Sequence, residues 1–242
     1  MLSFFRVAAF AFLTGALPLA TLVGPAAAES RAPVVVELYT SQGCSSCPPA
    51  DALLAQLAQR DDVIALSLHV DYWDYIGWED PFALGSLTER QRAYARHLDR
   101  RTVYTPQMVV DGIYDVIGSR ARSVANAIEM ARERATEVEV ALSQDGVRIG
   151  SGTPPAEGAA VWLLLYDSWH ETDVRRGENA GRQLGYAHVV RDYRRLGDWR
   201  GEETELPFSL AAARAAGRSG AAVIVQAEGP SRVLGAASLR LE

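Results

Sequence analysis

The stretch VVVELYTSQGCSSCPPADALLAQLAQRDDVIALSLHV, residues 34–70, decides the fold. It begins with β-branched and aromatic residues at 34–39 and ends with an apolar run at 63–70, and both segments are typical of buried strands. Between them, prolines at 48 and 49 suit the first turn of a helix, and apolar residues recur on one helical face between 53 and 58. The stretch therefore predicts a strand–helix–strand unit with parallel strands and a right-handed crossover.

The chain that follows predicts an α/β domain as far as residue 136. The expected elements are a helix over 88–100, a strand over 107–110, a second strand over 113–117 and a helix over 119–135. An Asp-Gly pair at 111–112 predicts a hairpin turn between the two strands.

Beyond residue 136 the pattern changes to short strands separated by turns. The candidates are 137–142, 147–149, 159–167, 172–176, 184–192, 203–208, 221–227 and 233–241, with one short helix over 209–217. Such spacing favours an antiparallel sandwich. We therefore expect an α/β domain over 29–136, followed by a smaller all-β sandwich-like domain over 137–242.

The first 28 residues have the features of a cleavable signal peptide. Arg6 is the only charged residue before Glu29, an apolar run covers 7–23, and Ala26–Ala28 supplies small residues for cleavage before Glu29. A retained membrane anchor is the alternative. We expect the mature protein to be periplasmic or secreted and free of the membrane.

Composition excludes several classes of protein. The 242 residues are 48% hydrophobic and 22% charged, so the chain can bury a core and is not disordered. Its net charge of −6 argues against nucleic-acid binding. Only two cysteines are present, which is too few for a disulfide scaffold or for a typical zinc site. In an exported protein, Cys44 and Cys47 are the natural disulfide pair.

Three distant segments are expected to meet at one edge of the sheet. The Cys44-Ser-Ser-Cys47 motif follows the first strand, and residues 70–73 follow the second, parallel strand. Pro106 joins them if the strand over 107–110 pairs antiparallel with the first strand. Open α/β sheets bind ligands at this edge.

These segments resemble the thioredoxin superfamily. Residues 39–47 with 106–112 are similar to the glutaredoxin pattern. A closer resemblance is to a secreted thioredoxin-like family, domain of unknown function 1223, and it rests on residues 37–48, 69–74, 104–107, 177–182 and 189–191. The resemblance implies a thioredoxin-like fold for the first domain and a cis peptide bond before Pro106. Leu38 stands where ordinary thioredoxins have a buried acid, so proton handling must come from elsewhere.

The position of Cys44 favours nucleophilic chemistry. A thiolate at a helix N-terminus is stabilised by the helix dipole and by free N–H groups, which lower its pKa. We expect Cys44 to exchange with a substrate disulfide and Cys47 to resolve the mixed disulfide. A static structural disulfide is the alternative, although so small a ring stabilises a fold only modestly.

The other candidate residues each have two interpretations. A cis Pro106 would let the Thr105 backbone pair with an incoming peptide, whereas a trans proline would merely start an edge strand. Asp71 either assists proton transfer or caps a turn. Trp73 and Trp78 either line a substrate groove or cover the sheet edge. His69 is interpreted as a satisfied strand residue, and residues 177–182 as a binding loop or a β-turn.

The resulting hypothesis is an exported thiol–disulfide oxidoreductase that needs no cofactor. Its partners would be protein or peptide thiols and disulfides, together with an unidentified redox partner that resets the cysteines. One alternative is a non-catalytic partner-binding module with a structural disulfide. Another is Cu(I) handling by the cysteines with His69 or His97.

Overall fold

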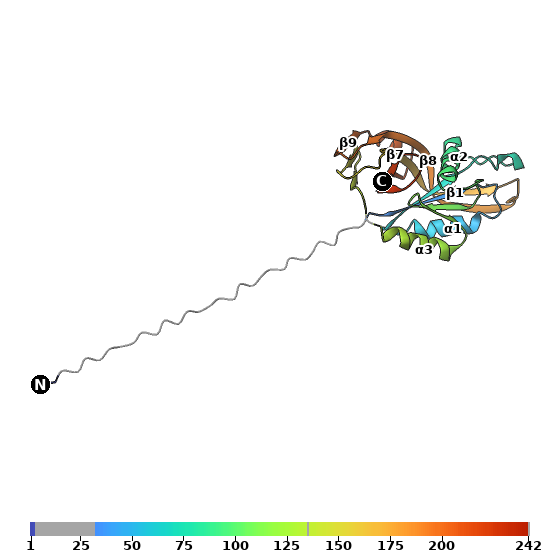
Figure 1. Ribbon diagram of the computed structural model, residues 1–242. Helices are drawn as coiled ribbons and strands as arrows, with labels where there is room; N and C mark the ends of the chain where they lie inside the picture. Colours follow the sequence, from blue (N-terminus) through green and yellow to red (C-terminus); the bar gives the residue numbers. More distant parts are fainter. Residues whose placement is uncertain (3–31, 135, 242) are drawn as a thin grey trace. The chain divides into compact units, whose positions relative to one another are not determined.

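The computed structural model describes residues 1–2, 32–134 and 136–241. The chain divides into two units, Met1–Ser30 and Arg31–Glu242, and the second carries every helix and strand described here (Figure 1). The expected signal peptide falls on residues 3–31 and so lies outside the described residues, apart from its first two. Within the part that the structure describes, no helix has the length and apolar character needed to cross a membrane.

An eight-stranded mixed sheet forms the centre of the second unit. Its strands run in the order β11-β10-β7-β8-β2-β1-β3-β4. Their bounds are β1 Val34–Thr40, β2 Val63–His69, β3 Gln107–Val110, β4 Tyr114–Ile117, β7 Ala159–Val174, β8 Arg182–Trp199, β10 Gly220–Ala227 and β11 Val233–Arg240. β1 pairs in parallel with β2, as the sequence predicts, and antiparallel with β3, which is the condition for Pro106 to lie at the same edge.

Helices cover both faces of the sheet around β1 and β2. The helical segments are α1 Pro48–Leu57, the 3-10 turn η1 Asp74–Ile76, α2 Gly85–His97, α3 Ala121–Arg132 and the short α4 Ala211–Ala215. α1 and α3 lie on one face, where Leu54 and Ile128 pack with Leu38, and α2 lies on the other (Figure 1). Every residue of β1 and β2 is therefore buried, which explains their nearly continuous apolar sequences.

The element order through residue 134 is the predicted one, with a shift at the second helix. α2 runs over Gly85–His97 rather than 88–100, and Leu84 is its N-cap residue. Thr88 lies inside the helix, where its hydroxyl donates a hydrogen bond of 2.7 Å to the Asp71 carboxylate. The Asp111-Gly112 turn joins β3 to β4 as expected. Gly112 has a φ of 74°, and a Cβ at this position would overlap the carbonyl oxygen of Ser231.

The second half of the chain extends the same sheet. Two predicted strands, 159–167 and 172–176, form the single long strand β7, which pairs with β8 to make a hairpin. β8 in turn joins β2 in parallel at Val189 and Ser67. The prediction of two separate domains that meet at residue 136 stays a prediction, because sheet continuity alone does not define domains.

A second sheet faces part of the large one. It consists of β5 Val140–Leu142, β6 Gly146–Ile149 and β9 Thr204–Pro207, all antiparallel. Ile149 packs with Leu163 of β7 and with Trp199 at the end of β8. The C-terminal strands thus lie in two facing sheets, and one of these sheets is the continuation of the N-terminal one.

Arg90 connects four elements in the interior of the protein. Its guanidinium group donates to both carboxylate oxygens of Glu37 in β1, and also to Tyr193 in β8 and Gln226 in β10. Tyr94, one turn further along α2, donates to the same Glu37 carboxylate. Because each buried charge has several partners, this network ties α2 to the sheet.

Candidate functional site

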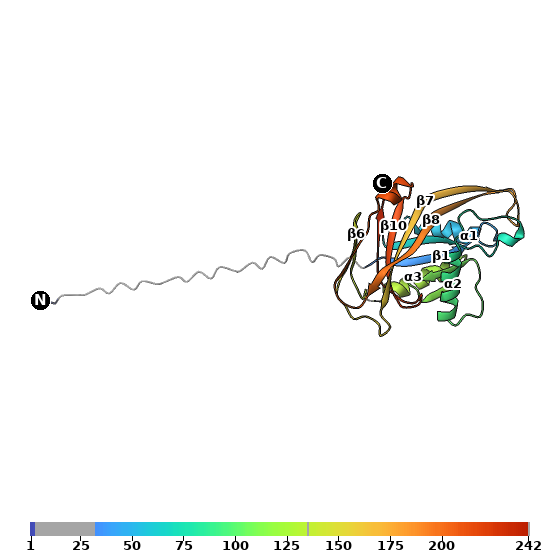
Figure 2. The ribbon, with the colours of Figure 1, turned by 90° about the horizontal axis from the view of Figure 1, so that it is seen from above.

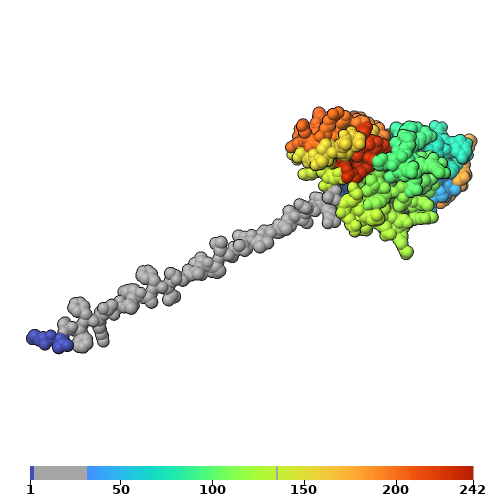
Figure 3. Space-filling model, in the orientation of Figure 1, coloured from blue at the N-terminus to red at the C-terminus, as the bar shows by residue number. Residues whose placement is uncertain are grey.

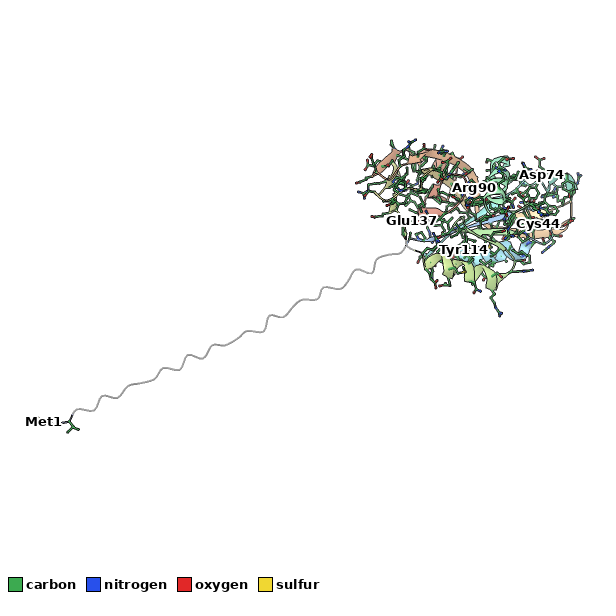
Figure 4. The ribbon with its side chains drawn as sticks, in the orientation of Figure 1. Met1, Cys44, Asp74, Arg90, Tyr114 and Glu137 are labelled. Atoms are coloured by element: carbon green, nitrogen blue, oxygen red, sulfur yellow. A yellow bond between two sulfur atoms is a disulfide. The ribbon has the colours of Figure 1, made fainter. Side chains whose placement is uncertain are left out.

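A disulfide joins Cys44 and Cys47 at the start of α1, as the sequence predicts. The Cα atoms are 5.4 Å apart. Cys47 occupies the N-cap position before Pro48, and its carbonyl oxygen accepts the backbone N–H of Ala50 at 2.8 Å. Both cysteines are 0% exposed. Figure 4 shows Cys44 at the same end of the unit as Asp74, with Arg90 further inside.

The peptide bond between Thr105 and Pro106 is cis, as the resemblance implies. Trp73 links this loop to the cysteine loop: its indole Nε1 donates to the Thr105 hydroxyl at 2.8 Å. A Cβ on Gly43 would lie 3.1 Å from the Cβ of Trp73, so the same tryptophan lies directly against the residue before Cys44.

A second connection runs on the α1 side of Pro106. The Pro106 carbonyl oxygen accepts the N–H of Gly118 at 2.9 Å. A Cβ on Gly118 would be 3.1 Å from the Cβ of Ala50 in α1, so these backbones approach closely. Trp73 and Gly118 thus connect the loop of Thr105 and Pro106 to Gly43 and Ala50, the residues on either side of the cysteine motif.

The indole N–H groups of Trp73 and Trp78 both donate hydrogen bonds to other side chains of the protein. Trp73 is half-buried against the α2-side core, and Trp78 packs beside Phe82 and Val174. Trp78 donates from Nε1 to the side-chain oxygen of Gln42 at 2.8 Å. Both interpretations, that the tryptophans cover the sheet edge and that they line a substrate groove, stay predictions.

Asp71 is exposed and bound to α2. Its carboxylate accepts the Thr88 hydroxyl, and its own N–H donates to that hydroxyl at 3.2 Å. Neither contact involves a cysteine. The carboxylate is therefore held by α2, and both interpretations of Asp71, as an acid that caps a turn and as an aid to proton transfer, stay predictions.

Sequence reasoning missed a buried polar cluster behind the disulfide. Asp51, four residues after Cys47 in α1, is 4% exposed and accepts the Thr40 hydroxyl at 2.8 Å. In β2, His69 places Nδ1 2.7 Å from the carboxylate of Asp80. Two buried polar atoms of the cluster have no hydrogen-bond partner: His69 Nε2 and the hydroxyl of Tyr186, whose ring lies 4.8 Å from the His69 ring. The available signal for Asp51 was its spacing, because residues i and i+4 share a helix face.

Burial and charge set the protonation of this cluster. Burial raises the pKa of Asp51 to about 7, although attraction to His69 and the Thr40 hydrogen bond lower it in part. Burial would also raise the pKa of Asp80, but attraction to His69 and hydrogen bonds from His69, Gln42 and Phe82 outweigh that cost and lower it. The two carboxyl groups thus have pKa values shifted in opposite directions, a pattern typical of functional sites.

The turn of the β7–β8 hairpin, residues 175–181, lies against the cysteine loop. The amide nitrogen of Asn179 donates to the carbonyl oxygens of Gln42 at 2.9 Å and of Cys44 at 3.0 Å. The carboxylate of Glu178 accepts the Ser45 hydroxyl at 2.6 Å. The long hairpin reaches toward this end in Figure 2, and in Figure 3 its orange residues border the cyan and blue surface. Residues 177–182 are thus both a turn and a contact to the motif.

The described residues show no metal centre. Within 32–134 and 136–241, no group of three or more His, Cys, Asp or Glu side chains is placed to hold an ion. The Cu(I) alternative has no observation in its favour.

Together these features define a class of protein: a mixed α/β protein with a C-x-x-C disulfide at the start of a helix and a cis-proline loop tied to it by a tryptophan. Residues 35–226 match the model of a family described as "protein of unknown function (DUF1223)", and the chain belongs to that family. This confirms the family resemblance. Among curated proteins, none matches the chain.

Two solved structures are similar to this protein. A crystal structure of a protein from Agrobacterium tumefaciens is 33% identical with a TM-score of 0.77, over 89% of this chain and 97% of that one. HBP35 of Porphyromonas gingivalis is 14% identical with a TM-score of 0.55, over 87% of this chain and 76% of that one, and this likeness concerns the fold alone.

Proposed function

We propose that this protein is an exported thiol–disulfide oxidoreductase with a thioredoxin-like arrangement over 29–136. Its substrates are protein or peptide disulfides, and a separate redox partner resets the cysteines. The exchange chemistry itself needs no cofactor, because it passes between sulfur atoms. The mixed α/β fold, the C-x-x-C disulfide and the cis-proline loop all support this reading.

The observation that carries the proposal is the position of Asp51. It lies one helical turn after Cys47, is buried, and has its pKa raised to about 7 by burial. A buried carboxyl group destabilises the fold, and a structural disulfide, which does not exchange, requires no proton acceptor beside it. A resolving thiol, in contrast, needs a nearby proton acceptor. Asp51 also lines a pocket of about 280 Å³.

The reaction proceeds in two exchange steps. The Cys44 thiolate attacks one sulfur of the substrate disulfide, forms a mixed disulfide and releases the first substrate thiolate. The Cys47 thiol then gives its proton to Asp51 and attacks the Cys44 sulfur, which breaks the mixed disulfide and releases the second substrate thiolate. The Thr105 backbone pairs with the substrate polypeptide during both steps.

A second candidate function is favoured by one specific observation, the complete burial of both cysteines. A non-catalytic partner-binding module would keep its disulfide closed, whereas an oxidoreductase must expose Cys44 for each exchange. The two candidates therefore differ in whether the reduced protein forms covalent bonds with substrates.

The test uses single-cysteine variants of the mature protein. Reduced Cys47→Ser should accumulate mixed disulfides with a disulfide-containing substrate such as insulin, because no resolving thiol is present. Cys44→Ser is the matched control and should accumulate few or none. Adducts are counted by non-reducing electrophoresis and mass spectrometry. Equal adduct levels in the two variants, or no adduct in either, would reject the oxidoreductase in favour of the binding module.

A further inference from the structure

We propose that residues 175–181 form a strap that closes over the Cys44–Cys47 disulfide in the oxidised protein and is released when the disulfide is reduced. This inference rests on the proposed function, since it describes how that site is regulated. The strap makes the site inaccessible in one redox state and available in the other.

Asn179 holds the strap in place. Its side chain is 0% exposed, and its amide nitrogen bridges the carbonyl oxygens of Gln42 and Cys44. Arg182 donates to the Asn179 side-chain oxygen at 2.8 Å, which fixes the orientation of the amide group. A buried side chain that donates to two backbone carbonyls accounts for a docked turn: the Cys44 carbonyl also accepts the Cys47 N–H at 3.2 Å, but loss of the Asn179 amide would remove one hydrogen bond from each carbonyl.

Glu178 provides the redox sensitivity. One of its carboxylate oxygens, Oε2, accepts both the hydroxyl of Ser45 at 2.6 Å and the N–H of Ser45 at 3.3 Å. Ser45 is the residue next to Cys44 at the start of the helical turn. The carboxylate thus occupies the backbone donor of the residue next to Cys44 and places a negative charge against the cysteine loop.

Reduction creates electrostatic repulsion between the Glu178 carboxylate and a Cys44 thiolate. A dithiol reductant transfers two electrons to the disulfide, becomes a disulfide itself and leaves Cys44 and Cys47 as thiols. When Cys44 loses its proton to solvent, its thiolate repels Glu178 and competes for the same N–H. The strap is therefore less stable in the reduced protein. By linkage, release of the strap favours the thiolate in return.

The ends of the strap allow it to move as a unit. Gly177 and Gly181 both have positive φ, 74° and 80°. A Cβ on Gly181 would meet no atom within 4 Å, whereas one on Gly177 would lie 3.3 Å from Cδ1 of Ile76, so opening of the strap also separates Gly177 from η1. The turn also has its own hydrogen bond, from the Gly181 N–H to the Val174 carbonyl at 2.8 Å. The strap can therefore leave the cysteine loop while the hairpin that carries it stays paired.

Hydrogen exchange on the unmodified protein tests the proposal directly. Peptides that cover 41–47 and 175–181 should exchange faster after reduction with dithiothreitol, while a peptide from the core of β1 and β2 should not change. In Glu178→Gln, which removes the charge but can keep the hydrogen bond, the difference between the redox states should shrink. Equal protection of the strap in both states of the unmodified protein would overturn the proposal.

The rate of reduction by dithiothreitol gives a second, independent readout. Asn179→Ala should be reduced about tenfold to a hundredfold faster, because it loses two hydrogen bonds of the closed state. Asp173→Asn, an exposed change on the same hairpin, is the control and should match the unmodified protein. Equal rates for Asn179→Ala and Asp173→Asn would contradict the strap.

These readouts use no substrate protein, so they separate the two proposals. A strap that opens on reduction, in a protein whose Cys47→Ser variant captures no substrate, would uphold the strap and reject the oxidoreductase. If Cys47→Ser captures substrate but the strap does not open on reduction, the oxidoreductase is upheld and the strap is rejected.

Discussion

Arg90 and Glu37 form a two-point ion pair in the interior of the protein, with Nε 2.6 Å from Oε1 and Nη2 3.1 Å from Oε2. Both side chains are fully buried, and they belong to α2 and β1. The pair is positioned on the sheet face opposite α1, so it fixes the helix that carries Thr88 without taking part in the sulfur chemistry.

Removal of Arg90 should be strongly destabilising. Arg90→Ala leaves the Glu37 carboxylate buried without its partner, which we expect to cost about 3–5 kcal/mol of unfolding free energy. Arg92→Ala, which changes an exposed arginine of the same helix, should cost less than about 1 kcal/mol. Urea denaturation measures both. Equal losses in the two variants would show that the buried pair adds nothing.

Asp51 should make stability depend on pH. Its pKa is raised from 3.8 to about 7, so the folded state holds the proton more tightly than the unfolded state. The contribution of protonated Asp51 to the free energy of unfolding is fully present below pH 4 and is lost as the pH rises to about 7. The cost amounts to about 4 kcal/mol, since each pKa unit corresponds to about 1.4 kcal/mol.

The variant Asp51→Asn tests whether Asp51 lowers the stability of the protein as the pH rises. It cannot ionise, so its stability relative to the unmodified protein should increase between pH 4 and pH 8. The exposed change Asp61→Asn is the control and should show no such trend. A constant difference between Asp51→Asn and the unmodified protein across this range would contradict a raised pKa.

Gly112 should tolerate no side chain. Gly112→Ala forces a Cβ into the carbonyl of Ser231 and keeps a positive φ, so we expect a loss of more than about 2 kcal/mol. Gly217→Ala, which has a φ of 76° and no atom within 4 Å of the added Cβ, is the matched control and isolates the cost of φ alone. Thermal unfolding compares the two, and similar losses would argue against the close contact.

Export should leave a mature chain that begins at Glu29. The small residues at 26–28 precede this position, and a signal peptidase cleaves after such residues. Intact mass of the protein recovered from a bacterial periplasm or culture medium measures the cleavage site. A full-length chain in the membrane fraction would instead indicate the retained anchor.

Local patterns predicted the first half of the fold well. The apolar runs of β1 and β2, the prolines of α1 and the Asp-Gly turn each have a physical cause within a few residues. The joining of β8 to β2 at Val189 and Ser67 has no such local signature, because strand pairing between distant segments depends on edges that only the folded chain presents.

The candidate site also combines features that local sequence predicts with features that only tertiary packing produces. The disulfide and the cis bond followed from a short motif and a family resemblance. Asp51 was missed because a polar residue in a helix is ordinarily exposed, and its burial depends on how α1 packs against β1, β2 and β8 in the folded chain. The contacts of Glu178 and Asn179 with the cysteine loop connect residues more than 130 positions apart, and no spacing rule reaches that far.

The pairing of β8 with β2 has a practical consequence for anyone who shortens this chain. A fragment ending at residue 136 would lose β8 and leave one side of β2 with unsatisfied backbone groups, which is a template for self-association. The cysteine-bearing half is therefore a poor candidate for expression on its own, and any engineered or naturally truncated version has to supply a replacement neighbour for that strand.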